Sequence, residues 1–517
     1  MAEIKKDVID QEYFLNEVIS KYNDGTAYYA LPADKWVARS LVPPGTGEYR
    51  NFSYISQHIP VYNSENCIAC MECVNVCPDA AIYAKVVSES DFNGKITEAP
   101  ADKQDFIKKV YGKPKKFWEL REKKGQTPGM FTISINPLKC KGCGECVKVC
   151  GKKEALKMTK KDDELMSNYA AHVEFTKKTL TPTKDEFINE KVLVDMLLKD
   201  DSWLYVGGAG SCMGCGETTA LRLMLAATGF KYGRESIAMF AATGCNSVYC
   251  STYPFNPLLV PWSNSLFENV ATFAMGARLR WDQIGRENKK IWGIGGDGAL
   301  YDIGFQPLSR VLASNMNVNI LCLDTQVYSN TGGQASTASF MGQAAKMASH
   351  GKTSPGKSEN RKELAMIALM HPNCYVAQTT PMHFNHFLRS IIAANEFDGP
   401  ALINVYTPCL PEHGIGDDES YDQAQLAVNS RAFPLFTYDP RKGDSFKERF
   451  DLTGNPALKE DWKLDADGNP IDFISFAKTQ GRFGKQFKGG VASEQIIAAN
   501  LDRLHNWRRL QEIAGIK

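Results

Sequence analysis

The second half of the chain alternates short apolar runs with stretches of helical periodicity. Residues 291–296, 317–324 and 400–408 are apolar runs of strand length, IWGIGG, NVNILCLD and PALINVYTP. Between them, apolar residues recur at helical spacing in 267–281 and 361–370. This alternation predicts an α/β domain with a doubly wound, mostly parallel sheet. In such sheets, ligands bind at the carboxyl ends of the strands.

Polar stretches divide the chain into five predicted parts. Residues 1–58 are polar and contain the breaker PPGTG, so they predict a connecting arm without a core of its own. Residues 59–160 carry closely spaced cysteines and predict a small α+β domain. A charged, mainly helical linker covers 161–200. The α/β domain covers 201–435, and a polar, aromatic extension covers 436–517.

Two segments each leave two interpretations open. The charged insertion near 84–130 separates the halves of the cysteine-rich domain. It is either a solvated loop or short helix, because runs of charge usually face water, or a flap over the cysteine sites. The extension ends in a helical pattern at 493–515. This segment could cap its own domain or wrap around a partner, and we favour wrapping.

Composition and charge exclude several functions. The chain has 517 residues, enough for two to four domains. A net charge of +1 gives no electrostatic basis for binding nucleic acid or an anionic membrane. We expect no membrane span, because no apolar run reaches about 18 residues, and no secretory signal. Fifteen cysteines then favour metal ligation in a reducing, cytoplasmic compartment over disulfides.

The spacing C-x₂-C-x₂-C-x₃-C occurs twice in the predicted α+β domain. Its members are Cys67, Cys70, Cys73 and Cys77, followed by Cys140, Cys143, Cys146 and Cys150. Bacterial ferredoxins with two [4Fe–4S] clusters have this spacing, and the fourth cysteine of each run ligates the cluster of the other run. Structural zinc sites usually pair CxxC motifs instead. The runs therefore predict two clusters and one-electron transfer.

Polar residues follow two of the predicted strands. Gly296, Asp297 and Gly298 follow the first apolar run, and Thr325 follows the second. Small residues let the backbone approach a phosphate, and an aspartate there can hold Mg²⁺ that shares the oxygens of a diphosphate. A GDG sequence alone is equally an ordinary turn, but two strand ends that converge on one metal predict a thiamine diphosphate site. This cofactor stabilises the carbanion left when a 2-oxo acid loses CO₂, and nearby clusters could take up the electrons.

Four further cysteines lie near predicted strand ends. Cys212 and Cys215 form a CxxC after the strand-like run 203–208, Cys245 ends the sequence ATGC, and Cys409 ends the sequence YTPC. The CxxC pair cannot complete a cluster, but Cys245 and Cys409 could supply the other two ligands. A redox-active CxxC and two small buried residues are the competing interpretation, and the spacing does not decide between them.

The order of these motifs resembles one family. The two ferredoxin runs, SCMGCGET, ATGCNS, GDGALYDIGF, LDTQVYSNTGGQ and YTPC follow one another as in the C-terminal part of the pyruvate:ferredoxin (flavodoxin) oxidoreductases. The resemblance covers most of residues 55–440, including APAD in the insertion. It implies a third, proximal [4Fe–4S] cluster with the ligands Cys212, Cys215, Cys245 and Cys409. Three cysteines, Cys250, Cys322 and Cys374, are left as core residues.

The same resemblance implies roles at the thiamine site. The residues expected to bind the cofactor are Gly216, Glu217, Cys245, Gly296, Asp297, Gly298, Thr325, Val327 and Asn330. Among them, Asp297, Thr325 and the carbonyl of Val327 would ligate Mg²⁺, and Asn330 would contact the diphosphate. Glu217 and Asn330 are the expected catalytic residues. The chain departs from the family at Gly151, where proline is usual, and we expect the cluster to survive this change.

The resemblance also implies an activity shared between subunits. Single-chain members carry pyrimidine-binding and CoA-handling domains ahead of the ferredoxin module, and residues 1–58 are too short for them. We therefore expect one subunit of a split enzyme, whose partner subunit carries those domains, in a dimer of heterodimers. The expected reaction converts pyruvate and CoA reversibly to acetyl-CoA and CO₂ and passes electrons to ferredoxin or flavodoxin.

Other functions remain alternatives. The substrate could be 2-oxoglutarate or another 2-oxo acid. The chain could also be an electron-transfer subunit with a vestigial α/β domain, although the set Asp297, Thr325, Asn330 and Glu217 argues against that interpretation. A non-oxidative thiamine decarboxylase would leave the clusters without a use.

Overall fold

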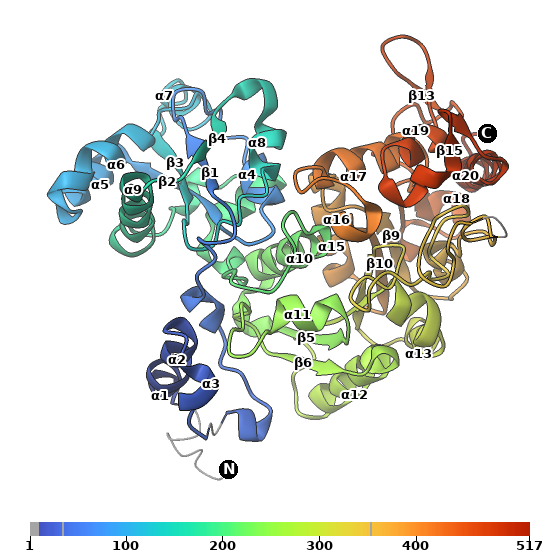
Figure 1. The fold of residues 1–517 in the computed structure, drawn as a ribbon, viewed down its shortest axis with the longest axis horizontal. Coiled ribbons are helices and arrows are strands. Elements are labelled where there is room, and N and C mark those ends of the chain that lie inside the picture. The colour runs from blue at the N-terminus through green and yellow to red at the C-terminus, as the bar shows by residue number, and fades with distance from the viewer. Residues whose placement is uncertain (1–9, 34–35, 352–353) are drawn as a thin grey trace. The chain divides into compact units, whose positions relative to one another are not determined.

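The chain folds into two compact units (Figure 1). The computed structural model describes residues 10–33, 36–351 and 354–517. Unit 1 comprises Met1–Gly214 and Val248–Pro261, and unit 2 comprises Cys215–Ser247 and Trp262–Lys517. The units are thus interleaved along the sequence, whereas we predicted consecutive parts with a limit near residue 200. None of the helices in the described ranges is long and apolar enough to cross a membrane.

Unit 1 contains the cysteine runs and two antiparallel strand pairs. Strand β1 (His58–Tyr62) pairs with β4 (Leu156–Lys160), and β2 (Ile82–Ser88) pairs with β3 (Gly129–Ile135). Helices α4 (Glu72–Val76) and α8 (Glu145–Cys150) contact each other. Each of these helices carries the third cysteine of one run, so both runs are held by the same loop-to-helix arrangement. This is the predicted ferredoxin-like α+β module.

The insertion between β2 and β3 is folded. It contains α5 (Glu89–Lys95), α6 (Gln104–Val110) and α7 (Glu119–Glu122). Phe117 is buried and stacks on Phe131 of β3, with ring centroids 5.7 Å apart. Short helices therefore describe the insertion, and buried aromatic side chains attach it to the module.

The linker after β4 also packs on the ferredoxin-like module. Helix α9 (Asp163–Glu174) continues into a π-helical turn, Phe175–Thr179, and α9 contacts β3. Tyr169 and His172 of this helix are buried. The segment is helical, as its sequence predicted.

The N-terminal arm shares a small core with a distant segment of the chain. Helix α1 (Gln11–Phe14) begins a short helical segment in which Phe14, Val18 and Ile19 are buried against Phe255. The arm recruits its core partner from a distant part of the chain, so its own sequence does not show the packing.

The run 203–208 is not a strand. It forms only an isolated bridge between Tyr205 and Leu258. Gly208 has a φ of 82°, which is left-handed backbone. A Cβ at this position would lie 2.0 Å from the carbonyl oxygen of Gly47. Gly208 therefore allows two backbone segments to approach each other closely, and the run does not form a pleated strand.

Unit 2 contains an eight-stranded sheet with the order β12-β11-β9-β10-β8-β7-β5-β6. The strands are β5 (Ile237–Ala242), β6 (Trp262–Ser265), β7 (Lys290–Gly296), β8 (Asn319–Asp324), β9 (Tyr375–Thr379), β10 (Ala401–Tyr406), β11 (Phe436–Tyr438) and β12 (Phe450–Asp451). Strands β5 to β10 pair in parallel, and β11 and β12 are antiparallel. The predicted mostly parallel sheet is confirmed, and the three predicted strands are β7, β8 and β10.

Helices cover both faces of this sheet. Side chains alternate along each strand, so Phe240 and Ile320 face one core, which α12 (Val270–Gln283) and α13 (Phe305–Leu312) cover. Helix α10 (Gly216–Tyr232) packs on α15 (Phe384–Glu396), which contacts β9 and β10 (Figure 1).

The helix predicted at 361–370 is short. Only α14 (Leu364–Ala368) forms in this region. The backbone N–H of Lys362 donates instead to the carbonyl oxygen of Thr337, 2.9 Å away. The predicted helix begins late because its first residues pair with another segment.

The C-terminal extension packs on unit 2. Strands β11 and β12 extend the sheet, and α20 (Glu494–Ile513) places Trp507 in its core. The Nε1–H of Trp507 donates to the carbonyl oxygen of Glu460, 2.8 Å away. The guanidinium of Arg431 lies 3.9 Å from the centre of the Trp507 ring. The described extension therefore caps its own domain, although we favoured a segment that wraps a partner.

Candidate functional site

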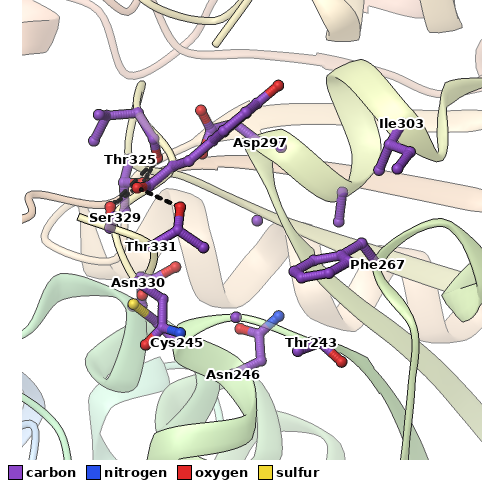
Figure 2. A pocket seen from close by; sticks show the side chains of 17 residues that line it. Thr243, Cys245, Asn246, Phe267, Asp297, Ile303, Thr325, Ser329, Asn330 and Thr331 are labelled. Atoms are coloured by element: carbon purple, nitrogen blue, oxygen red, sulfur yellow. Dashed lines mark hydrogen bonds between the residues drawn. The ribbon is translucent and has the colours of Figure 1, made fainter. Parts of the chain in front are cut away.

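The carboxyl ends of β5, β7 and β8 line a pocket of about 260 Å³ in unit 2 (Figure 2). Parallel pairing brings these strand ends to one edge of the sheet. Thr325, Ser329 and Asn330 lie along one wall, and Phe267 and Ile303 lie along the facing wall (Figure 2). The complete lining is Glu217, Thr243–Asn246, Phe267, Gly296–Ala299, Ile303, Thr325 and Val327–Thr331.

Three oxygen atoms converge at the polar wall. The Oγ1 of Thr325 lies 3.2 Å from Oδ1 of Asp297 and 2.9 Å from the carbonyl oxygen of Val327. Octahedral Mg²⁺ binds oxygen at 2.0–2.1 Å, so adjacent ligands are about 3.0 Å apart. Carboxylate, hydroxyl and carbonyl oxygens are all suitable ligands for this hard cation. The three residues therefore fit the edge of a magnesium site.

The Asp297 carboxyl group is buried, with 2% of the residue exposed. Burial, reinforced by the nearby Asp324 carboxylate, raises the pKa of Asp297 well above its usual value. Its other oxygen accepts a hydrogen bond from Ser336. A buried carboxylate is costly without a positive charge, and a bound divalent cation would supply one.

Asp324 has a different role, although it is next to Thr325 in the sequence. It forms a fully buried ion pair with Arg361 and accepts a hydrogen bond of 2.8 Å from the Tyr301 hydroxyl. Asn404 in turn donates to that hydroxyl, also at 2.8 Å. Asp324 therefore holds the end of β8 in the core, and Thr325 faces the pocket.

Two residues at the β7 and β8 ends shape the rest of the polar wall. A Cβ at Gly298 would lie 2.7 Å from the Tyr328 ring, so only glycine fits without displacing it. Asn330 is exposed on the turn after β8 and contributes its amide to the wall. Gly298 therefore leaves room for a diphosphate, and the Asn330 amide can contact it.

Glu217 and Cys245 meet on another side of the pocket. Glu217 lies in the first turn of α10, and its side chain is hydrogen-bonded to Cys245. Burial raises the pKa of Glu217 to about 7, although the hydrogen bond opposes this shift. Glu217 can therefore exchange a proton near neutral pH, beside a cysteine predicted to ligate a cluster.

Three of the four predicted proximal-cluster cysteines belong to unit 2. The N–H of Gly216, directly after Cys215, donates to the carbonyl oxygen of Pro408, directly before Cys409, at 3.3 Å. Cys245 is near this point because it contacts Glu217. The fourth cysteine, Cys212, is exposed and belongs to unit 1. The proximal cluster itself stays a prediction.

His413 is a site residue that the sequence analysis missed. Its Nε2 lies 2.8 Å from the carbonyl oxygen of Thr325, and the Cys409 N–H donates to Nδ1 at 3.4 Å. Burial lowers the pKa of His413 well below its usual value, so the ring is neutral. It connects the carbonyl group of Thr325 to Cys409, which is a predicted cluster ligand. Its position one helical turn after Cys409, on α16 (Leu410–His413), is the signal that could have found it.

The ferredoxin runs exchange their fourth cysteines. Cys77 lines one cavity together with Cys140, Cys143 and Cys146. At the other site, Cys150 is close enough to Cys67 and Cys73 to contribute to the raised pKa of both thiols, although burial is the main cause. This is the arrangement expected of two [4Fe–4S] clusters with crossed ligands.

The donor sets of both ferredoxin sites fit a cluster. Burial raises the pKa of Cys73 and Cys146 well above that of a free thiol, so a buried thiolate needs a positive partner. The N–H of Ala81 donates to Cys77 Sγ at 3.3 Å, as backbone amides do to cluster sulfurs. In the described ranges, no three His, Cys, Asp or Glu side chains are close enough to share one ion. In a cluster, each thiolate binds a different iron.

The three remaining cysteines lie in the core. Cys250, Cys322 and Cys374 are each 0% exposed. The prediction that they are core residues is confirmed.

Known protein families match both the pocket region and the ferredoxin runs. The thiamine pyrophosphate enzyme C-terminal TPP-binding domain matches residues 242–405. The 4Fe-4S dicluster domain matches residues 66–154. The polar wall of the pocket and both ferredoxin runs fall inside these matches.

Full-length relatives match most of the chain. It is 31% identical over 499 residues to the probable pyruvate-flavodoxin oxidoreductase of Escherichia coli (strain K12), covering 83% of this chain and 40% of that protein. It is 29% identical to the pyruvate:ferredoxin oxidoreductase of Moorella thermoacetica, and the match covers 86% of this chain and 42% of that protein. It is also 29% identical to the pyruvate-flavodoxin oxidoreductase of Trichormus variabilis, and the match covers 97% of this chain and 45% of that protein. The chain is a homologue of the pyruvate:ferredoxin (flavodoxin) oxidoreductases.

This oxidoreductase homologue spans about two fifths of the length of the curated relatives it matches. It contains the TPP-binding domain and the dicluster domain. Glu217, at the start of α10, lies outside both family matches but lines the same pocket as Asp297.

Proposed function

We propose that this chain is the thiamine- and cluster-bearing subunit of a 2-oxo acid:ferredoxin oxidoreductase. One observation carries the proposal: Asp297, Thr325 and Cys245 line the same pocket. A cofactor held by the first two residues would lie beside a cysteine predicted to ligate a cluster. This arrangement suits a reaction in which decarboxylation is followed by electron transfer.

The chain's own residues divide the work at the pocket. Thiamine diphosphate, when bound, supplies the carbanion stabilisation that lets a 2-oxo acid lose CO₂. Asp297, Thr325 and the Val327 carbonyl would hold Mg²⁺, and Asn330 would orient the diphosphate. Glu217 holds or releases a proton near neutral pH on the side that Cys245 lines.

Twelve cysteines form the proposed electron route. The two ferredoxin sites would each hold a [4Fe–4S] cluster, and Cys212, Cys215, Cys245 and Cys409 would hold a third. Electrons would leave to a ferredoxin or flavodoxin, and CoA would take the acyl group. Low-potential carriers also allow the reverse reaction, reductive carboxylation.

We further propose that a partner subunit completes the active site. Ile303 and Phe267 line the pocket, yet they are 60% and 37% exposed. Exposed apolar side chains at a pocket mouth suit a surface that another protein covers. The relatives are more than twice as long as this chain, so a partner that carries pyrimidine-binding and CoA-handling domains would supply the remaining functions. The expected assembly is a dimer of heterodimers.

Pyruvate is the proposed substrate, because the compared relatives are named for it. An electron-transfer subunit with a vestigial α/β domain is the weaker candidate, because the pocket contains all three oxygen ligands expected for Mg²⁺, from Asp297, Thr325 and Val327. Purification of the native complex separates the two functions. The enzyme is supported if the complex contains bound thiamine diphosphate and reduces viologen with a 2-oxo acid and CoA. The electron-transfer subunit is supported if the complex carries clusters but no thiamine diphosphate.

The partner dependence has its own test. The chain is purified alone, with its mass verified and its clusters intact, and assayed with pyruvate, CoA and viologen. We expect no turnover until the copurifying protein is added. Turnover by the verified single chain would remove the partner from the proposal.

A further inference from the structure

Each ferredoxin site in unit 1 has a lysine–carboxylate pair beside its cysteines. Lys153 pairs with Glu72 near the first site, and Lys141 pairs with Asp79 near the second. One member of each pair, Glu72 or Lys141, occupies a spacer position of the cysteine motif, where the motif does not specify the residue type. The two pairs have the same charges but very different exposure to solvent.

The pair at the first site contacts a ligand sulfur. The Nζ of Lys153 lies 3.4 Å from Cys70 Sγ and also donates to the Glu72 carboxylate. Cys70 Sγ lies 3.6 Å from the same carboxylate. The side chains of Lys153 and Glu72 are 28% and 33% exposed, so water and salt reach this pair.

The pair at the second site is buried. The Nζ of Lys141 lies 2.7 Å from Oδ1 of Asp79, and the side chains are 2% and 5% exposed. Lys141 and Asp79 line the same cavity as the four cysteines of this site. Lys141 also donates to Ser211 Oγ at 2.9 Å, and Ser211 Oγ donates to Asp79 at 3.2 Å.

The second network reaches beyond its own site. Lys141 follows Cys140 directly, and Asp79 comes two residues after Cys77. Ser211 directly precedes Cys212, and its carbonyl oxygen accepts a hydrogen bond of 2.7 Å from Lys141. Three residues that lie one or two positions from cysteines in different parts of the chain therefore form one hydrogen-bonded group.

Charge beside a cluster changes the energy of reducing it. Reduction adds one electron, so a nearby ammonium stabilises the reduced form and a nearby carboxylate opposes it. In the low dielectric of a buried site this interaction is strong and poorly screened, whereas salt weakens it at an exposed site. The two pairs should therefore act on their clusters with different dependence on ionic strength.

We infer that Lys153 and Lys141 each set the reduction potential of one ferredoxin-type cluster, independently of the other. The inference rests on the proposed function only in that both clusters must be present. Lys153 acts through the sulfur of Cys70 and is sensitive to salt. Lys141 acts from within the protein, is insensitive to salt, and also holds the Cys212 loop through Ser211.

Lys153→Met and Lys141→Met test the inference in the purified full chain with its clusters. The potentials are measured by redox titration followed by electron paramagnetic resonance, in low salt and in 1 M NaCl. A Cys70→Ser variant assigns the signal of the first cluster. We expect each lysine variant to lower only the potential of its own cluster. In 1 M NaCl the shift should shrink for Lys153→Met and persist for Lys141→Met.

Matched variants separate charge from structure. Asp79→Asn and Glu72→Gln keep the lysines and should raise the potentials of their own clusters. Ser211→Ala keeps both charges of the buried pair, so it should leave the potential of the second cluster nearly unchanged. If the Lys141→Met variant loses iron, the Asp79→Asn variant still tests whether charge at this pair shifts the reduction potential of the second cluster.

Two results would overturn the inference. Potentials unchanged in Lys153→Met, Lys141→Met and Asp79→Asn at full iron content would show that the pairs do not act on the clusters. A joint shift of both clusters in either variant would show that they do not act separately. Wild-type chain that binds no iron would instead contradict the proposed function.

Discussion

The Oγ1 of Thr325 lies 3.2 Å from Oδ1 of Asp297, although 28 residues separate them in the sequence. Asp297 directly follows β7 and Thr325 directly follows β8, and these strands are parallel neighbours. Parallel strands end at the same edge of a sheet, so one step in strand order brings the two oxygens together. The oxygen set of the proposed metal site is therefore a direct product of the sheet topology.

Replacement of this carboxylate should release the cofactor. We expect Asp297→Ala to retain roughly a tenth or less of the wild-type thiamine diphosphate, because no other group can replace the charged Mg²⁺ ligand. Thiamine content after gel filtration measures the loss, and paramagnetic resonance checks that the ferredoxin-type clusters remain. Asp302→Asn is the matched control, because Asp302 binds Tyr328 and Thr337 rather than the oxygen set. Full retention in Asp297→Ala would disprove the assignment.

Iron content tests the third cluster. Three [4Fe–4S] clusters require about twelve irons per chain, and loss of one leaves about eight. We expect Cys409→Ser to show this drop in anaerobically purified protein. As a control, Cys374→Ser changes a core cysteine and should leave the count at about twelve. A wild-type count near eight that Cys409→Ser does not change would eliminate the proximal cluster.

The ferredoxin-like module should lose stability in acid because of His172. This histidine is 1% exposed, and burial lowers its pKa from 6.5 to about 3. The unfolded chain therefore binds a proton between pH 6.5 and 3 that the folded chain does not bind. Stability is fully present above pH 6.5 and falls as the pH drops, by up to about 1.4 kcal/mol per pH unit.

His172→Gln should remove this contribution. Its amide can replace the contacts of His172 Nε2 with Thr132 and Ser134, which are 3.2 and 3.3 Å long. The measurement is the thermal midpoint for loss of cluster absorbance at pH 7 and pH 5. We expect a larger fall for the wild type than for the variant. Equal falls would show that His172 does not titrate as described.

Trp507 should anchor the C-terminal extension to unit 2. Its side chain is fully buried and combines core packing, a hydrogen bond to Glu460 and a contact with Arg431. We expect Trp507→Ala to cost about 3–5 kcal/mol, the usual range for a large buried aromatic residue. Trp507→Phe keeps a ring and should cost less. Limited proteolysis of the extension measures both effects, and equal resistance in all three proteins would contradict this role.

Substrate choice should favour pyruvate. A pocket built for a methyl group would bury the second carboxylate of 2-oxoglutarate without a partner, which is costly. We expect kcat/KM for pyruvate to be at least about tenfold higher, which needs only about 1.4 kcal/mol. The measurement is CoA-dependent viologen reduction by the intact complex. A preference for 2-oxoglutarate would change the substrate and leave the rest of the proposal standing.

Local sequence patterns predicted the elements whose geometry is local. The apolar runs that became β7, β8 and β10 are buried strands, and their order along the chain brings Asp297 close to Thr325. The ferredoxin runs were predictable for a similar reason, since their spacing fixes how a loop can surround a cluster.

Long-range packing was not predictable in this way. Phe255 completes the core of the N-terminal arm, and His413 contacts the carbonyl oxygen of Thr325, 88 residues away, and no local pattern contains these contacts. The network of Lys141, Asp79 and Ser211 likewise joins three separate segments. The C-terminal extension is polar overall, but buried apolar residues, Trp507 among them, attach it to the core.

The interleaving of the two units has a consequence for how such a protein can evolve. The chain passes from one unit to the other after Gly214, after Ser247, within helix α11 (Cys245–Cys250), and after Pro261. A single break after Gly214 would leave unit 2 whole but would remove Val248–Pro261 from unit 1, so no single break releases both units intact. A fission or fusion that exchanges one of them as a block would cut the other. Separate inheritance of the two units would therefore require breaks at more than one of these passages.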